Sequence, residues 1–234
     1  MGITKHIPNT ITSCNLICGC IATGCAMHEH YTSALLFIIL GAIFDFFDGM
    51  SARLLHVSSE IGKELDSLAD DITFGVAPAA MVYSVCKSCV YPSFLGGLAA
   101  YLPYIAFVMA AFSAIRLAKF NLDTRQTTSF IGLPTPANAL FWGALIVAHQ
   151  PTFTDGSNEW VGIGLIAGSL IFSYLLVAEL PMFALKFKNL SWADNKIKYV
   201  FVLTSVVLIC ILGISGISAV ILWYIILSAF TQNK

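Results

Sequence analysis

The sequence predicts an all-α, polytopic transmembrane helix bundle of about eight spans, with a six-helix core and a C-terminal hairpin. Of the 234 residues, 58% are hydrophobic and only 11% are charged. The mean hydropathy of +0.83 lies far above that of soluble domains. The formal net charge is −1 and the basic residues form no run, which argues against nucleic acid as a partner.

Each expected span is an apolar stretch close to the roughly 20 residues that a helix needs to cross a bilayer. The first six are expected at residues 9–27, 33–56, 66–86, 95–117, 134–149 and 159–183. The stretch from Lys198 to Phe230 is too long for one crossing, and Gly213 and Gly216 favour a tight reversal between two helices. We interpret residues 1–234 as one domain, with a core at about 1–185 and a helix pair at about 197–231.

The distribution of basic residues predicts the orientation of the spans. If the N-terminus is cytoplasmic, every lysine and arginine except Lys87 falls in a cytoplasmic loop or end. This asymmetry is the positive-inside signature. The first span follows Lys5, and we interpret it as a helix rather than a cleaved leader. Without an organelle address in the sequence, we expect a multi-pass protein of a prokaryotic inner membrane.

Four aspartates between residues 45 and 70 predict a metal site. Asp45 and Asp48 are three residues apart, and Asp66 and Asp70 are four apart, so each pair shares one face of a helix. Four carboxylates beside lipid are highly unfavourable without cations. Hard divalent ions take oxygen ligands and leave positions open for phosphates. We therefore expect one or two such ions at the cytoplasmic ends of the second and third spans.

Gly49, Ala52 and Arg53 lie beside these acids. The two small residues leave a helix face without bulk, where a phosphate or a flat ring can approach the backbone. Glycine and alanine also mediate ordinary helix contacts in membranes. The planar guanidinium of Arg53 suits phosphate oxygens, and it is equally able to neutralise an aspartate.

The whole pattern resembles the signature of the CDP-alcohol phosphotransferases at every fixed position. That signature is carried here by Asp45-x-x-Asp48-Gly49-x-x-Ala52-Arg53, then Gly62-x-x-x-Asp66-x-x-x-Asp70. Further segments are similar to the phosphatidylserine synthase branch: Gly62–Asp70, Phe74–Pro78, Arg116–Asn121 and Gly132–Pro136. Pro8–Thr12 is typical of the first span of the family, and the resemblance covers about the first 140 residues.

The resemblance implies transfer of a phosphatidyl group from CDP-diacylglycerol to L-serine, which gives phosphatidylserine and CMP. It implies two divalent cations, Mg²⁺ or Mn²⁺, held by Asp45, Asp48, Asp66 and Asp70, with Asp70 also acting as general base. It also implies a homodimer. The implied contacts to the liponucleotide are Asn9, Thr12, Asp48, Gly49, Ala52, Arg53 and Ser59.

For the serine substrate, the cytoplasmic end of the fourth span offers Arg116, Lys119 and Asn121. Membrane topology alone also explains basic residues at this position. Three alternative functions stay open. The first is the same reaction with another acceptor, which is glycerol phosphate, inositol phosphate or an archaeal lipid analogue. The second is an intramembrane prenyltransferase, and the third is a cation transporter. The first differs only in the acceptor. The other two normally distribute their acids more widely than this 26-residue stretch does.

Two further features are interpreted as structural. Asp71 points about 100° away from Asp70 on a helix, so we expect a solvated or outer acid rather than a ligand. The pair Cys86-x-x-Cys89 is weak evidence for zinc without a second pair. Packing, or an incidental external disulfide, is the favoured role for these cysteines.

Overall fold

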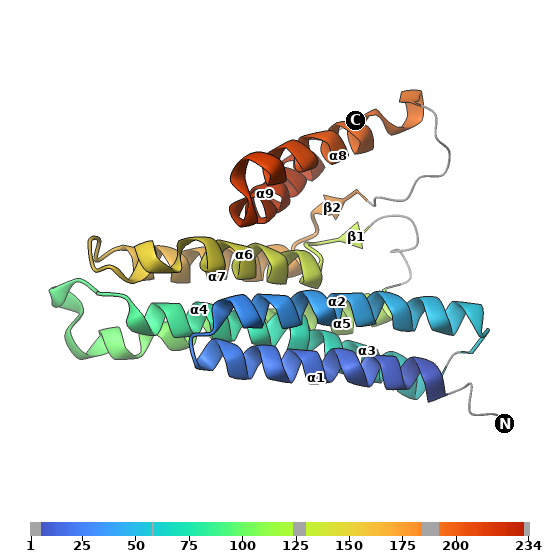
Figure 1. The fold of residues 1–234 in the computed structure, drawn as a ribbon, viewed down its shortest axis with the longest axis horizontal. Helices are drawn as coiled ribbons and strands as arrows, with labels where there is room; N and C mark the ends of the chain where they lie inside the picture. The colour runs from blue at the N-terminus through green and yellow to red at the C-terminus, as the bar shows by residue number, and fades with distance from the viewer. Residues whose placement is uncertain (1–5, 58, 124–129, 184–191, 232–234) are drawn as a thin grey trace.

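The protein is a bundle of long helices, as the computed structural model shows for residues 6–57, 59–123, 130–183 and 192–231 (Figure 1). The all-α prediction is confirmed. The main helices are α1 (Ile7–Met27), α2 (Tyr31–Leu54), α3 (Glu60–Asp70), α4 (Ala77–Ser88), α5 (Val108–Leu122), α6 (Thr135–Thr154), α7 (Val161–Val177), α8 (Trp192–Leu212) and α9 (Ile214–Thr231).

The helices stack in layers (Figure 1). Helices α1 to α5 form the first layer, α6 and α7 form the second, and the α8–α9 hairpin lies on the far side of the second layer from α1. Helix α9 makes the contact between this hairpin and α6. The stacking agrees with the predicted core followed by a C-terminal pair.

Helix α4 is the centre of the core. All ten residues from Ala77 to Cys86 are buried, and the helix contacts α1, α6 and α7. Alanines at positions 77, 79 and 80 are fully buried, and small side chains let neighbouring backbones approach closely in a membrane bundle. Between α6 and α7 the rings of Phe141 and Phe172 stack with their centroids 4.1 Å apart.

A π-helical segment, η2 (Asp71–Val76), joins α3 to α4 without a break. It follows directly after Asp70 and precedes Pro78, which lies in the first turn of α4. Proline cannot donate a backbone hydrogen bond and its ring crowds the carbonyl four residues earlier. A wider turn before the proline relieves that crowding, and such turns recur at functional sites.

The third expected span begins at Glu60 rather than 66 and the fifth ends at Thr154 rather than 149. The fourth and sixth differ also in the kind of structure at one end. The fourth was expected at 95–117, but residues 93–107 form two 3-10 segments, η3 (Ser93–Ala100) and η4 (Leu102–Phe107), before α5. Gly96 interrupts η3 with φ +50°. The sixth was expected to reach residue 183, but α7 ends at Val177, where Ala178 is extended. Short strands β1 (Phe130–Ile131) and β2 (Pro181–Met182) pair there.

The C-terminal hairpin reverses where the sequence predicts, although the two glycines have different roles. Gly213 has φ +59° and makes the turn, a conformation that glycine adopts without strain. Gly216 already lies within α9. A Cβ there would come within 2.6 Å of the Leu208 carbonyl oxygen, so this glycine permits close contact between α8 and α9.

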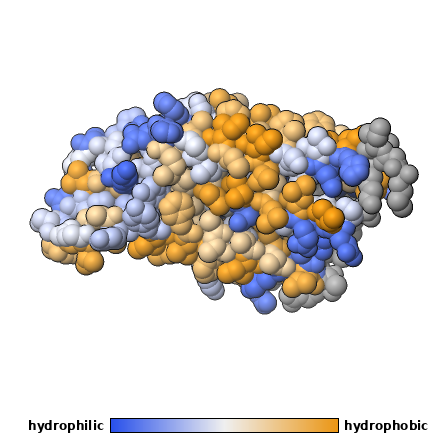
Figure 2. All heavy atoms as spheres, turned by 90° about the horizontal axis from the view of Figure 1, so that it is seen from below, coloured by the Kyte–Doolittle hydropathy of each residue, from blue (hydrophilic) through white to orange (hydrophobic). Residues whose placement is uncertain are grey.

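The surface has the pattern of a membrane protein. In the described residues, four helical stretches are long and apolar enough to cross a bilayer: Ile7–Met27, Tyr31–Leu54, Leu102–Leu122 and Asn195–Leu212. Val161–Val177 and Ile214–Phe230 are shorter apolar helices. Figure 2 shows apolar residues over the middle of one face and hydrophilic residues toward both ends of the long axis. The predicted count of eight spans stays a prediction.

Substitution of Gly19 tests the close packing of α1 on η2. A Cβ at this position would lie 2.8 Å from the Thr73 backbone, so Gly19→Ala should destabilise the fold by about 1–3 kcal/mol. The measurement is the thermal unfolding midpoint in detergent. Gly24→Ala on the same helix is the control, because nothing lies within 4 Å of its added Cβ. Equal midpoints for the two variants would contradict this packing.

Candidate active site

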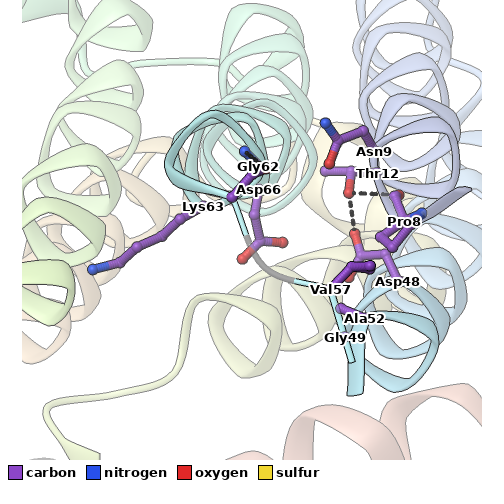
Figure 3. Close-up of a pocket in the computed structure, with 11 residues that line it drawn as sticks. Pro8, Asn9, Thr12, Asp48, Gly49, Ala52, Val57, Gly62, Lys63 and Asp66 are labelled. Carbon is purple, nitrogen blue, oxygen red and sulfur yellow. Dashed lines mark hydrogen bonds between the residues drawn. The ribbon is translucent and has the colours of Figure 1, made fainter. Parts of the chain in front are cut away.

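Three of the four predicted aspartates meet where α2 and α3 face each other. One carboxylate oxygen from each of Asp45, Asp48 and Asp66 lies within 4.8 Å of the other two. Asp45 and Asp48 come from the last turns of α2, and Asp66 comes from α3. Figure 3 shows the Asp48 and Asp66 carboxylates on opposite sides of one space. The helical spacing in the sequence predicted this convergence.

Helix α1 supplies hydrogen-bond donors to the acids of both neighbouring helices. Thr12 Oγ1 donates to Asp48 Oδ2 at 2.6 Å, as Figure 3 shows. One turn further along, Asn15 Nδ2 donates to Asp70 Oδ1 at 3.0 Å. The sequence argument named Thr12 but missed Asn15. The available signal was its position three residues after Thr12 on the same helix face.

The arrangement of carboxylates fits a divalent cation. Asp66 Oδ1 is buried and has no hydrogen-bond partner. Ionised carboxylates accept hydrogen bonds but donate none, so three of them cannot satisfy one another at this distance. Hard divalent cations bind oxygen ligands of this type. Asp70 lies outside this closest group of three, with one oxygen held by Asn15.

A cavity of about 200 Å³ opens beside the acids (Figure 3). Its wall combines the beginning of α1, the end of α2 and the beginning of α3. The lining residues are Pro8, Asn9, Thr12, Asp48, Gly49, Ala52, Val57, Ser59, Gly62, Lys63 and Asp66. Six of the seven residues expected to contact a liponucleotide therefore line one cavity. The seventh, Arg53, is described separately below.

Arg53 is exposed and folds back over Gly49. A Cβ on Gly49 would lie 3.4 Å from its Nη1 atom, and otherwise only Nη2 of the same side chain comes within 4 Å. The helix face between Asp48 and Arg53 is therefore open, as the small residues in the motif predict. The guanidinium lies beside this open face.

Ser59 and Asn9 shape the opposite wall. Ser59 is the N-cap of α3, and its Oγ accepts a hydrogen bond from the Gly62 backbone N at 3.0 Å. This is the standard capping arrangement, so Ser59 has a structural role in addition to lining the cavity. A Cβ on Gly62 would lie 2.9 Å from Asn9 Oδ1. Glycine at this position therefore lets α1 approach the start of α3.

Arg116 and Lys119 line a second, smaller cavity of about 50 Å³, together with Glu179 and Leu176. Arg116 is only 8% exposed, and its Nε is buried without a hydrogen-bond partner. Gly132 helps to form this region because its φ of +78° and its close approach to the Leu176 carbonyl exclude a side chain. The cavity thus has a buried cation on its wall.

Asn121, the third residue predicted to contact serine, faces α3 instead. Its Nδ2 donates to Ser67 Oγ at 2.7 Å, and its backbone oxygen accepts from Lys63 Nζ at 2.9 Å. Lys63 accordingly extends away from the Asp66 carboxylate in Figure 3. These bonds tie α3 to the end of α5, which the sequence argument did not foresee.

The two features interpreted as structural lie apart from the acid cluster. The Asp71 carboxylate faces α5, because its Oδ1 and Ser113 Oγ both lie within 2.8 Å of the point where a Gly75 Cβ would be. The Asp71 side chain is partly buried rather than solvated, and its Oδ1 has no hydrogen-bond partner.

Cys86 and Cys89 are free thiols that donate to the carbonyl oxygens of Gly162 and Phe153.

Known proteins are similar to this chain in sequence. Residues 5–178 match the family model described as CDP-alcohol phosphatidyltransferase. A CDP-diacylglycerol–serine O-phosphatidyltransferase of Bacillus subtilis is 38% identical over 176 residues, covering 75% of this chain and 89% of the relative. One of Helicobacter pylori strain J99 is 29% identical over 237 residues, covering 97% and 94%.

A protein of Saccharomyces cerevisiae with the same name is 35% identical over 147 residues, covering 56% of this chain and 50% of the relative. The family model covers well over half of the chain, including the converging acids, both glycines of the motif and the cavity wall. The chain therefore belongs to the CDP-alcohol phosphatidyltransferase family.

Proposed function

We propose that the protein transfers the phosphatidyl group of CDP-diacylglycerol to the hydroxyl of L-serine, releasing CMP and forming phosphatidylserine. The observation that carries the proposal is the convergence of Asp45, Asp48 and Asp66 beside a cavity lined by Asn9, Thr12, Gly49 and Ala52. Relatives named CDP-diacylglycerol–serine O-phosphatidyltransferase support serine as the acceptor.

The four aspartates would hold two divalent cations, Mg²⁺ or Mn²⁺. When bound, such ions polarise the phosphorus and stabilise negative charge on the departing phosphate. Asp45, Asp48 and Asp66 are already within reach of one another, and Asp70 would complete the set from the next turn of α3. Thr12 holds Asp48 by its hydrogen bond, and fixing a ligand in this way raises metal affinity.

The nucleotide end of the donor would occupy the larger cavity. Asn9, Thr12 and Ser59 offer polar atoms on its wall, and Gly49 and Ala52 leave space for close approach of the pyrophosphate or the base. Arg53 lies at the edge of that space, where its fork of donors suits phosphate oxygens. This assignment places the reacting phosphate beside the acids.

Asp70 is assigned as the general base. The serine hydroxyl oxygen forms a bond to the phosphorus that carries the diacylglycerol, and its proton goes to the Asp70 carboxylate. The bond from that phosphorus to the oxygen bridging the two phosphates breaks, and its electron pair leaves with CMP. Atoms and charge balance without an oxidant or reductant.

Arg116 and Lys119 would bind the serine carboxylate in the smaller cavity. Arg116 keeps a buried donor without a partner, and a guanidinium pairs well with a carboxylate. Asn121 follows these two residues on α5, but its side-chain amide donates to Ser67. In this proposal Asn121 is therefore near the serine site and does not bind serine through that amide nitrogen. The positive charge on this wall would favour an acceptor that carries a carboxylate.

The position of the chain in the cell is part of the proposal. We place it in the cytoplasmic inner membrane with the acids facing the cytoplasm, because the basic residues gather on that side. Residues 1–234 would act as a single domain, with a core to about residue 185 and a helix pair at about 197–231. The family resemblance supports a homodimer.

The acceptor and the base can be tested together. Purified protein with CDP-diacylglycerol and Mn²⁺ should release CMP when serine is added. Turnover with glycerol 3-phosphate but not serine would contradict the acceptor and leave the family intact. Asp70→Asn should lose turnover by a factor of at least about 100, the usual scale of general base catalysis, yet still bind CDP in calorimetry. Full activity in this variant would remove Asp70 as the base.

Thr12→Val tests the hold on Asp48. Removing the 2.6 Å hydrogen bond should raise the half-saturating Mn²⁺ concentration about tenfold, the lower end of the effect of outer metal-site partners. The matched control is Thr23→Val on the same helix, whose hydroxyl donates to the Gly19 carbonyl. The same Mn²⁺ requirement in both variants and in the wild type would refute this role.

Arg116→Gln tests the serine site. It removes the buried charge while keeping most of the volume, so the serine KM should rise about tenfold or more, the effect of losing one hydrogen bond to a charged group. The KM for CDP-diacylglycerol should stay within about twofold. Lys87→Gln is the control, because Lys87 is an exposed cation in the last turn of α4, outside the group of residues that line the smaller cavity. A rise in the lipid KM instead would assign Arg116 to the donor.

A further inference from the structure

Asn15 is a fully buried amide in the middle of an apolar helix, and no part of the function proposed above uses it. It is 0% exposed and lies one turn beyond Thr12 on α1. Its Nδ2 donates to Asp70 Oδ1 at 3.0 Å. Asn9, Thr12 and Asn15 are spaced by three residues, so one face of α1 carries all three toward the site.

The direction of the amide follows from its partner. A carboxylate offers only acceptors, whereas an asparagine side chain has one donor end and one acceptor end. An amide oxygen turned toward Asp70 Oδ1 at 3.0 Å would be repelled, so the nitrogen must face the acid. The amide oxygen then points into the packed interior, where it has no hydrogen-bond partner.

Two close contacts keep Asn15 in place, and a third holds its neighbour Thr73. Its backbone oxygen accepts a hydrogen bond from Thr73 Oγ1 at 3.0 Å. A Cβ on Gly41 would lie 2.9 Å from Asn15 Oδ1 and 2.5 Å from Thr73 Cγ2, so α2 packs directly against the amide. Gly19 on α1 packs against the Thr73 backbone. The amide therefore has little freedom to turn away from Asp70.

Packing alone does not explain an asparagine here. A buried amide oxygen without a partner is unfavourable, and leucine, a close match in size, would fill the same space with no polar group to satisfy. The position keeps an amide although its oxygen is unpaired. The bond to Asp70 is the interaction that leucine would lose.

We infer that Asn15 is a positioning residue for Asp70, whose carboxylate it holds in one orientation. Oδ1 accepts from Asn15, which leaves Oδ2 and the second lone pair of Oδ1 for a cation and for the substrate hydroxyl. The bond fixes the direction in which these lone pairs point. This inference rests on the proposed function, because it acts through Asp70 as the base.

Asn15→Leu tests the inference, since it removes the donor and keeps the approximate size. It should lower kcat for serine-dependent CMP release by about 10- to 100-fold, the scale expected when a catalytic group is misplaced. The KM values for serine and CDP-diacylglycerol, and the Kd for CDP by calorimetry, should stay within about twofold when both are measured at saturating Mn²⁺, which offsets any weaker binding of the ion by Asp70. Asn138→Leu is the matched control, because Asn138 is also 0% exposed but its side-chain amide has no hydrogen-bond partner among the described residues.

Gly41→Ala gives a second test, because the added Cβ would lie 2.5 Å from Thr73 Cγ2 and 2.9 Å from Asn15 Oδ1, and so displaces the Asn15 amide while every polar group stays in the chain. It should also lower kcat while CDP still binds. Gly164→Ala, with nothing within 4 Å of its Cβ, is the control. If Asn15→Leu does not fold, Gly41→Ala decides the question.

Unchanged kcat in Asn15→Leu would overturn the positioning role. So would a loss of CDP affinity as large as the loss of kcat, because a merely structural residue would give that result. The activity of the wild type, measured in the same assay, separates a failure of the proposed function from a failure of the proposed role of Asn15. Absence of serine-dependent CMP release in the wild type refutes the proposed function, whereas an active wild type with an unimpaired Asn15→Leu refutes only the role of Asn15.

Discussion

Desolvated negative charge is the constraint on which the rest of this structure depends. Asp45, Asp48, Asp66 and Asp70 are concentrated at one end of an apolar bundle, and removing even one carboxylate from water costs several kcal/mol. Thr12 and Asn15 each satisfy one oxygen, while a buried oxygen of Asp66 remains bare. These oxygens fit a divalent cation, and under the proposed function the bound cations would attract the diphosphate of the substrate to this place.

The helix packing serves this constraint. Small residues are required where backbones must come close enough for α1 to reach the acids of α2 and α3, and Gly19, Gly41 and Gly62 are the clearest cases. The π-helical turn after Asp70 leads into the buried helix α4. Adjacent helical residues point about 100° apart, so Asp70 faces Asn15 on α1 while the next residue, Asp71, faces α5. Two adjacent acids therefore lie in different environments.

The features that depend on hydropathy and fixed spacing could be predicted from the sequence. Helix type follows from hydropathy and the length of the apolar stretches. The C-terminal reversal follows from the glycines at 213 and 216 in a stretch too long for one crossing, and the pairing of Asp45 with Asp48 follows from their helical spacing. The late start of the fourth span and the bond from Asn121 to Ser67 could not, because they depend on backbone geometry at Gly96 and on contacts between distant helices. The partnership of Asn15 with Asp70 was missed for the same reason, since 55 residues separate them in the chain.

A crystal structure with CDP and Mn²⁺, using the anomalous signal of manganese, tests the central claim most directly. The account predicts anomalous peaks in contact with oxygens of Asp45, Asp48 and Asp66, next to the diphosphate of the bound nucleotide. A map in which CDP is clearly bound while those carboxylates contact no manganese, or are turned away from one another, would contradict it.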